Sequence, residues 1–160
     1  MSLPELLWLY RQAKQFKTIV EIGCWKGKST HALLTGALKN GGQVTVVDHF
    51  QGAKGQEWFF KEVAYRDMYH VFMSNLGHLP NLEVLKMSSV EGAQHIDSAE
   101  MVFIDAGHDY EDIKADLDAW EGKATRMLCG HDYQFPGVKK AVMERFGVPM
   151  VIDTIWYVEV

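Results

Sequence analysis

Short apolar runs alternate with amphipathic segments along this 160-residue chain, and this alternation constrains the fold more than any other feature. The runs are apolar at successive positions, which is typical of strands covered on both faces. Strands that alternate with helices predict a parallel, doubly wound α/β sheet. The expected strands are Thr18–Gly23, Gln43–Asp48, Leu82–Lys86, Glu100–Asp105 and Thr125–Gly130, and the expected helices are Lys28–Lys39, Gln56–Leu76, Val90–Ile96, Tyr110–Glu121 and Pro136–Phe146.

The chain has no repeat, low-complexity tract or linker, so we expect one domain over residues 1–160. Ser2 and Glu5 have capping-box spacing and predict an N-terminal helix within residues 1–17. Residues 150–160 are rich in β-branched and aromatic side chains and should complete the sheet. We therefore expect a Rossmann-like, mostly parallel sheet of order 3-2-1-4-5, with C-terminal strands added to it.

Charge and hydropathy exclude several function classes. Lys and Arg number 16 against 21 Asp and Glu, and no basic run is present, so we expect no nucleic-acid partner. No apolar stretch approaches the roughly 20 residues that cross a bilayer, and no signal-peptide pattern is present, so we expect a cytoplasmic protein without a membrane partner. Cys24 and Cys129 end strands that the expected order separates by about 10 Å, so we expect free thiols.

A polar or flexible residue stands where each expected strand ends. Ligands of doubly wound sheets bind beyond the carboxyl ends of the strands, which predicts a site here. The alternative is that any strand must leave the sheet through a polar loop. The residues are Gly23, Asp48, Lys86–Ser88, Asp105 and His131–Asp132.

The loop after the first strand reads E-I-G-C-W-K-G-K-S-T over residues 21–30. A dinucleotide fingerprint needs Gly-x-Gly-x-x-Gly, which this loop lacks. A phosphate-binding P-loop ends in Gly-Lys-Ser, as Gly27, Lys28 and Ser29 do, but it needs four residues between its glycines where this loop has three. A P-loop nucleotide hydrolase therefore stays open, as does a non-catalytic binding module. The pattern Glu-x-Gly-x-x-x-Gly fits the loop without gaps.

That pattern resembles motif I of the class I S-adenosylmethionine-dependent methyltransferases. F-I-D-A-G-H-D-Y at 103–110 and G-H-D-Y at 130–133 resemble two elements of a small-molecule subfamily, methyltransferase family 24. V-D-H-F-Q-G at 47–52 and I-W-Y-V at 155–158 fit the same subfamily. The resemblance extends from about residue 19 to residue 160.

The resemblance implies an S-adenosylmethionine site and a small-molecule acceptor, methylated at oxygen rather than at nitrogen or carbon. Asp48 would bind the ribose, because two cis hydroxyls can donate to its two oxygens. Ser88 and Ser89 lie where the family contacts adenine, and they equally fit a cap of the next helix with Glu91. The implied cofactor-binding residues are Glu21, Gly23, Cys24, Gly27, Asp48, His49, Ser88, Ser89 and Asp105.

Asp105 and His108 are the expected catalytic residues. Methyl transfer is an in-line displacement, so the protein must align the acceptor and remove the proton of a hydroxyl. His108 is the expected general base, because an imidazole titrates near neutrality. The alternative is a histidine that caps or packs against the following helix.

A metal site is a further implication of the resemblance. Related sugar and catechol O-methyltransferases hold a divalent cation with an Asp after the fourth strand and an acidic pair after the fifth. Asp105 matches the first, whereas the pair here is His131 and Asp132. The imidazole weakens a Mg²⁺ site and suits Zn²⁺, Mn²⁺ or Fe²⁺ better. We therefore expect these three residues as the candidate ligands and expect no obligatory metal.

Residues 51–80 are unusually aromatic. Residues 65, 68, 69, 72, 73 and 76 form a helical stripe that predicts burial in the core. The sequence W-F-F at 58–60 fits no single helix face, which predicts a lid over the site or a homodimer contact.

Overall fold

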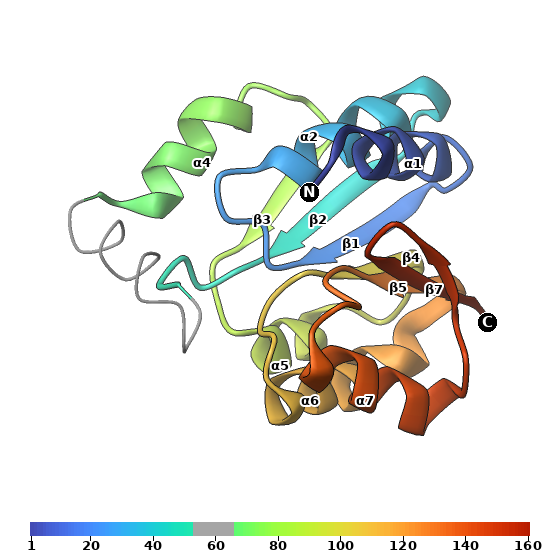
Figure 1. Cartoon of the computed structure of the whole chain (residues 1–160). Helices are drawn as coiled ribbons and strands as arrows, with labels where there is room; N and C mark the ends of the chain where they lie inside the picture. Colours follow the sequence, from blue (N-terminus) through green and yellow to red (C-terminus); the bar gives the residue numbers. More distant parts are fainter. Residues whose placement is uncertain (53–65) are drawn as a thin grey trace.

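The computed structural model describes residues 1–52 and 66–160. Their strands form one seven-stranded sheet in the order β3-β2-β1-β4-β5-β7-β6 (Figure 1). Strands β1 to β5 pair in parallel, and β7 runs antiparallel to both β5 and β6. This confirms the predicted Rossmann-like order with C-terminal strands added. The strands are β1 (Thr18–Ile22), β2 (Gln43–Val47), β3 (Leu82–Leu85), β4 (Ala99–Ile104), β5 (Ala124–Gly130), β6 (Met150–Ile152) and β7 (Ile155–Glu159).

Helices cover both faces of the sheet (Figure 1). One face carries α1 (Leu3–Ala13), α2 (Lys28–Ala37) and α4 (Met68–Leu76), and the other carries α5 (Ser89–Gly92), α6 (Tyr110–Trp120) and α7 (Pro136–Phe146). Short 3-10 turns extend three of these helices at Leu38–Asn40, Ala93–His95 and Glu121–Lys123. None of the helices described here is long and apolar enough to cross a membrane.

Each face of the sheet has its own apolar core. Neighbouring strand residues point to opposite faces, so Ile19 packs with the α1–α2–α4 side while Val20 packs with the α5–α6–α7 side. Both residues are buried, which explains why the strands read as continuous apolar runs. Cys24 and Cys129 are buried free thiols, as expected.

Of the predicted helix Gln56–Leu76, the structure describes residues 66–76. Residues 66 and 67 are not helical, so the prediction is wrong there. Helix α4 starts only at Met68, because the carboxylate of Asp67 accepts the main-chain N–H of His70 and so caps the helix there. Met68, Phe72 and Leu76 are buried, which confirms the predicted stripe within the described residues. Residues 58–60 and Tyr65 lie outside the described residues, so the lid and the homodimer stay predictions.

Helix α1 is held firmly on the sheet through α2. The predicted capping box is present, since the Ser2 hydroxyl accepts from the Glu5 N–H and the Glu5 side chain accepts from the Ser2 N–H. A Cβ added to Gly36 of α2 would lie 2.5 Å from the main-chain oxygen of Tyr10 in α1. The two helices therefore cross at a distance that only glycine allows, and this crossing sets the position of α1.

Candidate cofactor and active site

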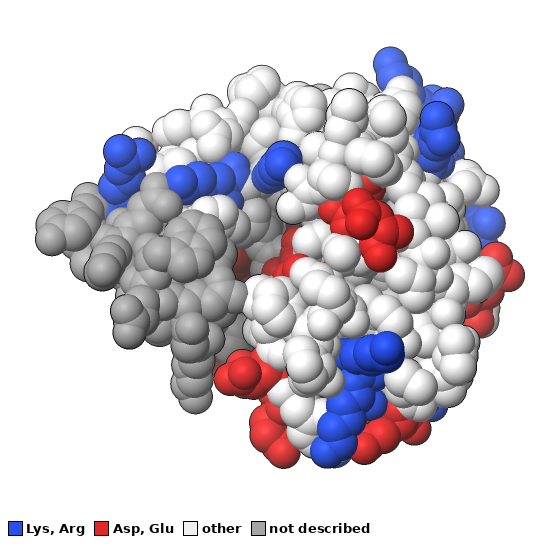
Figure 2. Space-filling view, viewed as in Figure 1, with Lys and Arg blue, Asp and Glu red and all other residues white. Residues whose placement is uncertain are grey.

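A cleft of about 1600 Å³ opens at the carboxyl ends of the parallel strands. Figure 2 shows acidic side chains inside the hollow on this face of the molecule. Loops that follow β1, β2, β3, β4 and β5 all contribute to its lining. The predicted site residues that line it are Gly23, Cys24, Asp48, His49, Ser88, Ser89, Asp105, His108, His131 and Asp132.

Glu21 and Gly27 are the two predicted site residues that do not line this cleft. Glu21 is fully buried beneath the loop, where the Thr30 hydroxyl donates to Oε2 at 2.5 Å. Its Oε1 has no hydrogen-bond partner among the described residues. Burial raises the pKa of Glu21 to about 8. Gly27 has a positive φ of 91° at the start of α2, and a Cβ there would collide with Leu76 of α4.

The loop after β1 is folded around the carboxylate of Asp48. Oδ2 accepts the main-chain N–H groups of Cys24 at 2.9 Å and Trp25 at 3.3 Å. Oδ1 accepts the N–H of Phe50 at 2.6 Å. The Cys24 thiol also donates to Oδ2, at 3.5 Å, so three donors share Oδ2 and one uses Oδ1. A ribose hydroxyl would therefore find its free acceptor at Oδ1.

The loop after β3 uses its serines as helix caps. Ser88 and Glu91 form the capping box of α5, as one of the two predicted alternatives requires. The Ser89 hydroxyl accepts the indole N–H of Trp120 at 2.8 Å. Asp116 of α6 also lines the cleft, and its burial raises its pKa to about 6. No pattern in the sequence points to Asp116 as a site residue.

His108 is oriented by two neighbours. Its Nε2 lies 2.6 Å from Oδ2 of Asp132, and its ring stacks on Phe135 with centroids 5.0 Å apart and planes 7° apart. The hydrogen bond that His108 donates to Asp132 raises the pKa of His108 above its usual value. Asp132 adopts a left-handed φ of 61°, which is uncommon for a residue with a Cβ.

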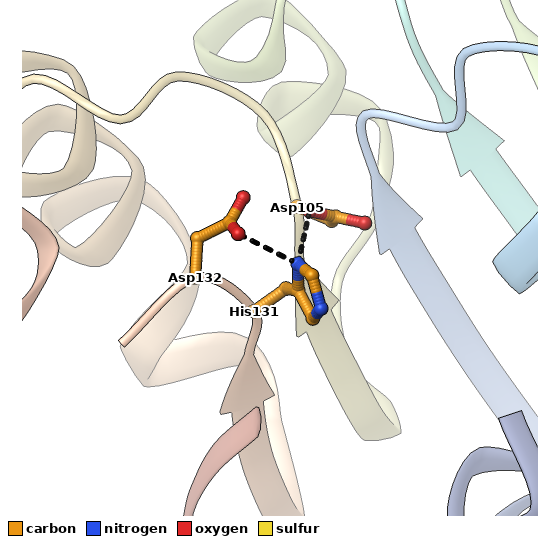
Figure 3. A group of neighbouring side chains, drawn as sticks. All are labelled: Asp105, His131 and Asp132. Atoms are coloured by element: carbon orange, nitrogen blue, oxygen red, sulfur yellow. Dashed lines mark ion pairs between the residues drawn. The ribbon is translucent and has the colours of Figure 1, made fainter. Parts of the chain in front are cut away.

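Nδ1 of His131 faces the carboxylates of Asp105 and Asp132 (Figure 3), and the opposite edge of the ring faces Glu5. Nδ1 is 3.1 Å from Oδ1 of Asp132 and 3.5 Å from Oδ1 of Asp105. Nε2 is 3.1 Å from Oε1 of Glu5. Burial opposes the ring charge, but the hydrogen bonds and charges of Asp105 and Asp132 outweigh it and raise the pKa of His131 to about 10.

Glu5 is a site residue whose sequence pattern predicts only a helix cap. It is 2% exposed and lies directly behind His131, 126 residues away in sequence. Burial alone would raise its pKa, but bonds from Thr154 and Ser2 and the charge of His131 lower that pKa to about 2. Its signal in the sequence is an acid at the i, i+4, i+8 spacing of Leu9 and Ala13, the buried face of α1.

The sequence profile of a methyltransferase-domain family matches residues 20–133. The chain belongs to this methyltransferase family. The P-loop alternative is therefore wrong, and the Lys28 ammonium instead donates to the main-chain oxygen of Met1 at 2.7 Å. No curated protein matches the sequence significantly.

Solved methyltransferases share the fold. A methyltransferase from Geobacter sulfurreducens has a TM-score of 0.69 at 13% identity, covering 99% of this chain and 80% of its own. An O-methyltransferase from Bacillus cereus in complex with SAH (S-adenosylhomocysteine) has a TM-score of 0.63 at 16% identity, with 100% and 82% covered. An SAH-bound methyltransferase from Podospora anserina has a TM-score of 0.64 at 15% identity, with 98% and 78% covered.

The raised pKa of Glu21 predicts a pH-dependent cost in stability. Its contribution is fully present below pH 4.5, its ordinary pKa, and is lost as pH rises through about 8. Between pH 4.5 and about 8, Glu21 should lower the free energy of unfolding of the wild type by up to about 1.4 kcal/mol per pH unit. Glu21→Gln should abolish this decrease. Urea denaturation at pH 5, 7 and 9 measures it. Glu83→Gln, at an exposed position on β3, is the control, and equal pH profiles for wild type and Glu21→Gln would contradict the account.

Proposed function

We propose that this protein is an S-adenosylmethionine-dependent methyltransferase that methylates a hydroxyl oxygen of a small molecule. The main support is that Asp105, His108 and Asp132 lie together at the edge of the cleft. The chain that holds them belongs to a methyltransferase family. The SAH complex of the Bacillus cereus O-methyltransferase, which has the same fold, supports the cofactor and the acceptor atom.

The cofactor would lie along the loops after β1, β2 and β3. Gly23 brings its main chain to the cleft without a Cβ, and Asp48 offers Oδ1 to the ribose. Ser88 and Ser89 would contribute main-chain groups, since Glu91 and Trp120 hold their hydroxyls. Glu21 and Gly27 would act from behind, by supporting the loop rather than by touching the ligand.

The residues that follow β4 and β5 would handle the acceptor. S-adenosylmethionine supplies a methyl group already activated by its sulfonium. Asp132 orients His108 through its contact with Nε2, and His108 would take the hydroxyl proton as the general base. Phe135 fixes the plane of that ring, and Asp105 would orient the acceptor from the neighbouring loop.

This mechanism needs no divalent cation, and we propose none as obligatory. The group that would hold one is Asp105, His131 and Asp132, whose ligand atoms lie within 4.8 Å of one another. At Nδ1 of His131, the 3.1 Å separation from Asp132 falls within the roughly 3.0–3.4 Å expected between ligands bonded at about 2.1 Å to one ion, and the 3.5 Å separation from Asp105 lies just above it. The residues therefore fit a cation, which would polarise an acceptor hydroxyl when bound.

Calorimetric titration with S-adenosylmethionine tests the cofactor. We expect micromolar binding that Asp48→Asn weakens by about 1–3 kcal/mol, because charged hydrogen bonds are lost. Asp97→Asn, which alters an exposed acid outside the cleft, should leave the affinity unchanged. Binding of ATP instead, or of neither ligand, would refute the proposal.

Release of S-adenosylhomocysteine in the presence of a panel of catechols, phenols and sugars tests the base. With any accepted hydroxyl compound, His108→Gln should lower kcat by about 10²–10⁴-fold, the usual contribution of a general base. The affinity for S-adenosylmethionine should stay the same, and His78→Gln is the control at an exposed position. A His108→Gln enzyme of normal kcat would show that another group takes the proton.

A further inference from the structure

The mechanism above leaves one buried charge without a task. Glu5 of α1 reaches the cleft edge from behind, and its Oε1 lies 3.1 Å from Nε2 of His131. The same oxygen accepts the N–H of Thr154 at 3.1 Å and its hydroxyl at 2.5 Å. A buried carboxylate is costly unless other groups compensate its charge, so this arrangement calls for a reason.

Glu5 requires that Nε2 of His131 carries a hydrogen. An ionised carboxylate only accepts hydrogen bonds, so Nε2 must donate to it. The Thr154 oxygen, 3.0 Å from Nε2, has already given its hydrogen to Glu5 and cannot donate to the ring. The ring is therefore fixed with Nε2–H toward α1 and Nδ1 toward the cleft.

At the cleft side, Nδ1 faces two further acceptors. Asp132 Oδ1 and Asp105 Oδ1 both approach it, and His108 holds the second oxygen of Asp132 from the far side at 2.6 Å. A bare nitrogen lone pair among two carboxylate oxygens is repulsive. A positive particle must therefore lie between these three atoms, either a proton on Nδ1 or a cation that takes its place.

The surroundings of the ring favour a cation. A metal-binding histidine almost always donates its other N–H to a carboxylate, a main-chain carbonyl or water, and here Glu5 provides the carboxylate. Asp132, another of the candidate ligands, is likewise held in place, by a hydrogen bond that His108 donates. One imidazole nitrogen beside two carboxylates suits Zn²⁺, Fe²⁺ or Mn²⁺ better than Mg²⁺.

We propose that Glu5 is the positioning residue of a divalent transition-metal site formed by Asp105, His131 and Asp132. It acts by holding Nε2–H of His131 and so directing Nδ1 at the two carboxylates. The inference deepens the proposed function, because this site shares the cleft edge with His108. Metal binding does not, however, depend on methyl transfer, so the two can fail separately.

Metal titration of the full-length protein tests the proposal without an acceptor. Co²⁺ followed by visible absorption, and Zn²⁺ followed by calorimetry, should each show one site per chain, with Mg²⁺ bound at least tenfold more weakly. Glu5→Gln should weaken Zn²⁺ binding by about 10–100-fold, the usual effect of losing such a partner. The control is Ser2→Ala, which removes the cap hydroxyl of α1 but not the contact with His131, and should change the affinity less than about twofold.

Two outcomes would overturn the proposal: wild-type protein that gives no Co²⁺ absorption beyond that of the aqueous ion, or Glu5→Gln with wild-type affinity. Should Glu5→Gln not fold, ¹⁵N-histidine NMR of the wild type gives the answer, with His131→Asn assigning the signal. Nε2 should stay protonated while Nδ1 shifts on addition of Zn²⁺, and a shift at Nε2 or at neither nitrogen refutes the site. Normal S-adenosylmethionine binding in protein that takes no metal would leave the proposed function intact, whereas metal uptake without S-adenosylmethionine binding would refute only the function.

Discussion

The approach of two main chains at the ends of β1 and β4 sets the geometry of the whole site. Asp105 donates its N–H to Ile22 at 2.7 Å, and Gly23 donates its N–H to Val47 at 2.9 Å. Gly23 adopts a φ of 79°, and a Cβ there would collide with the main-chain oxygen of Asp105. Only glycine therefore lets the loops after β1, β2 and β4 leave the sheet at one point, with Asp48 and Asp105 on either side of it.

Charge balance is the second constraint on this edge of the sheet. Glu5 and Asp132 both have a pKa held below the usual range, and each is matched by an imidazole. Glu21 lacks such a partner, and its pKa rises instead. The site thus keeps Glu5 and Asp132 ionised beside His131 and His108, and favours the neutral form of Glu21, which lies under the loop after β1.

The sheet could be predicted because its strands are covered on both faces, so that burial leaves a continuous apolar run in the sequence. The end of each strand then located most of the cleft, since parallel strands end at one edge. Periodicity was less reliable for the start of α4, because the apolar stripe continues past the point where the His70 N–H donates to Asp67 and the helix begins. Local chemistry prevails over periodicity at such a boundary.

The sequence could not predict how deeply each site residue is buried or which residues meet across long distances in the chain. A motif match assigns Glu21 and Gly27 to a ligand but cannot tell a residue that touches it from one that supports the loop from beneath. Glu5 shows the same limit more sharply. Its local pattern accounts fully for a helix cap, and only the crossing of α1 with α2 at Gly36 brings it to His131.

A crystal structure of the protein with S-adenosylhomocysteine would show where the cofactor lies relative to the strand ends, and is the decisive measurement. We expect a ribose hydroxyl at Oδ1 of Asp48, adenine near Ser88 and Ser89, and the sulfur directed toward Asp105 and His108. Density for the ligand outside this cleft, or a ribose placed away from Asp48, would contradict it.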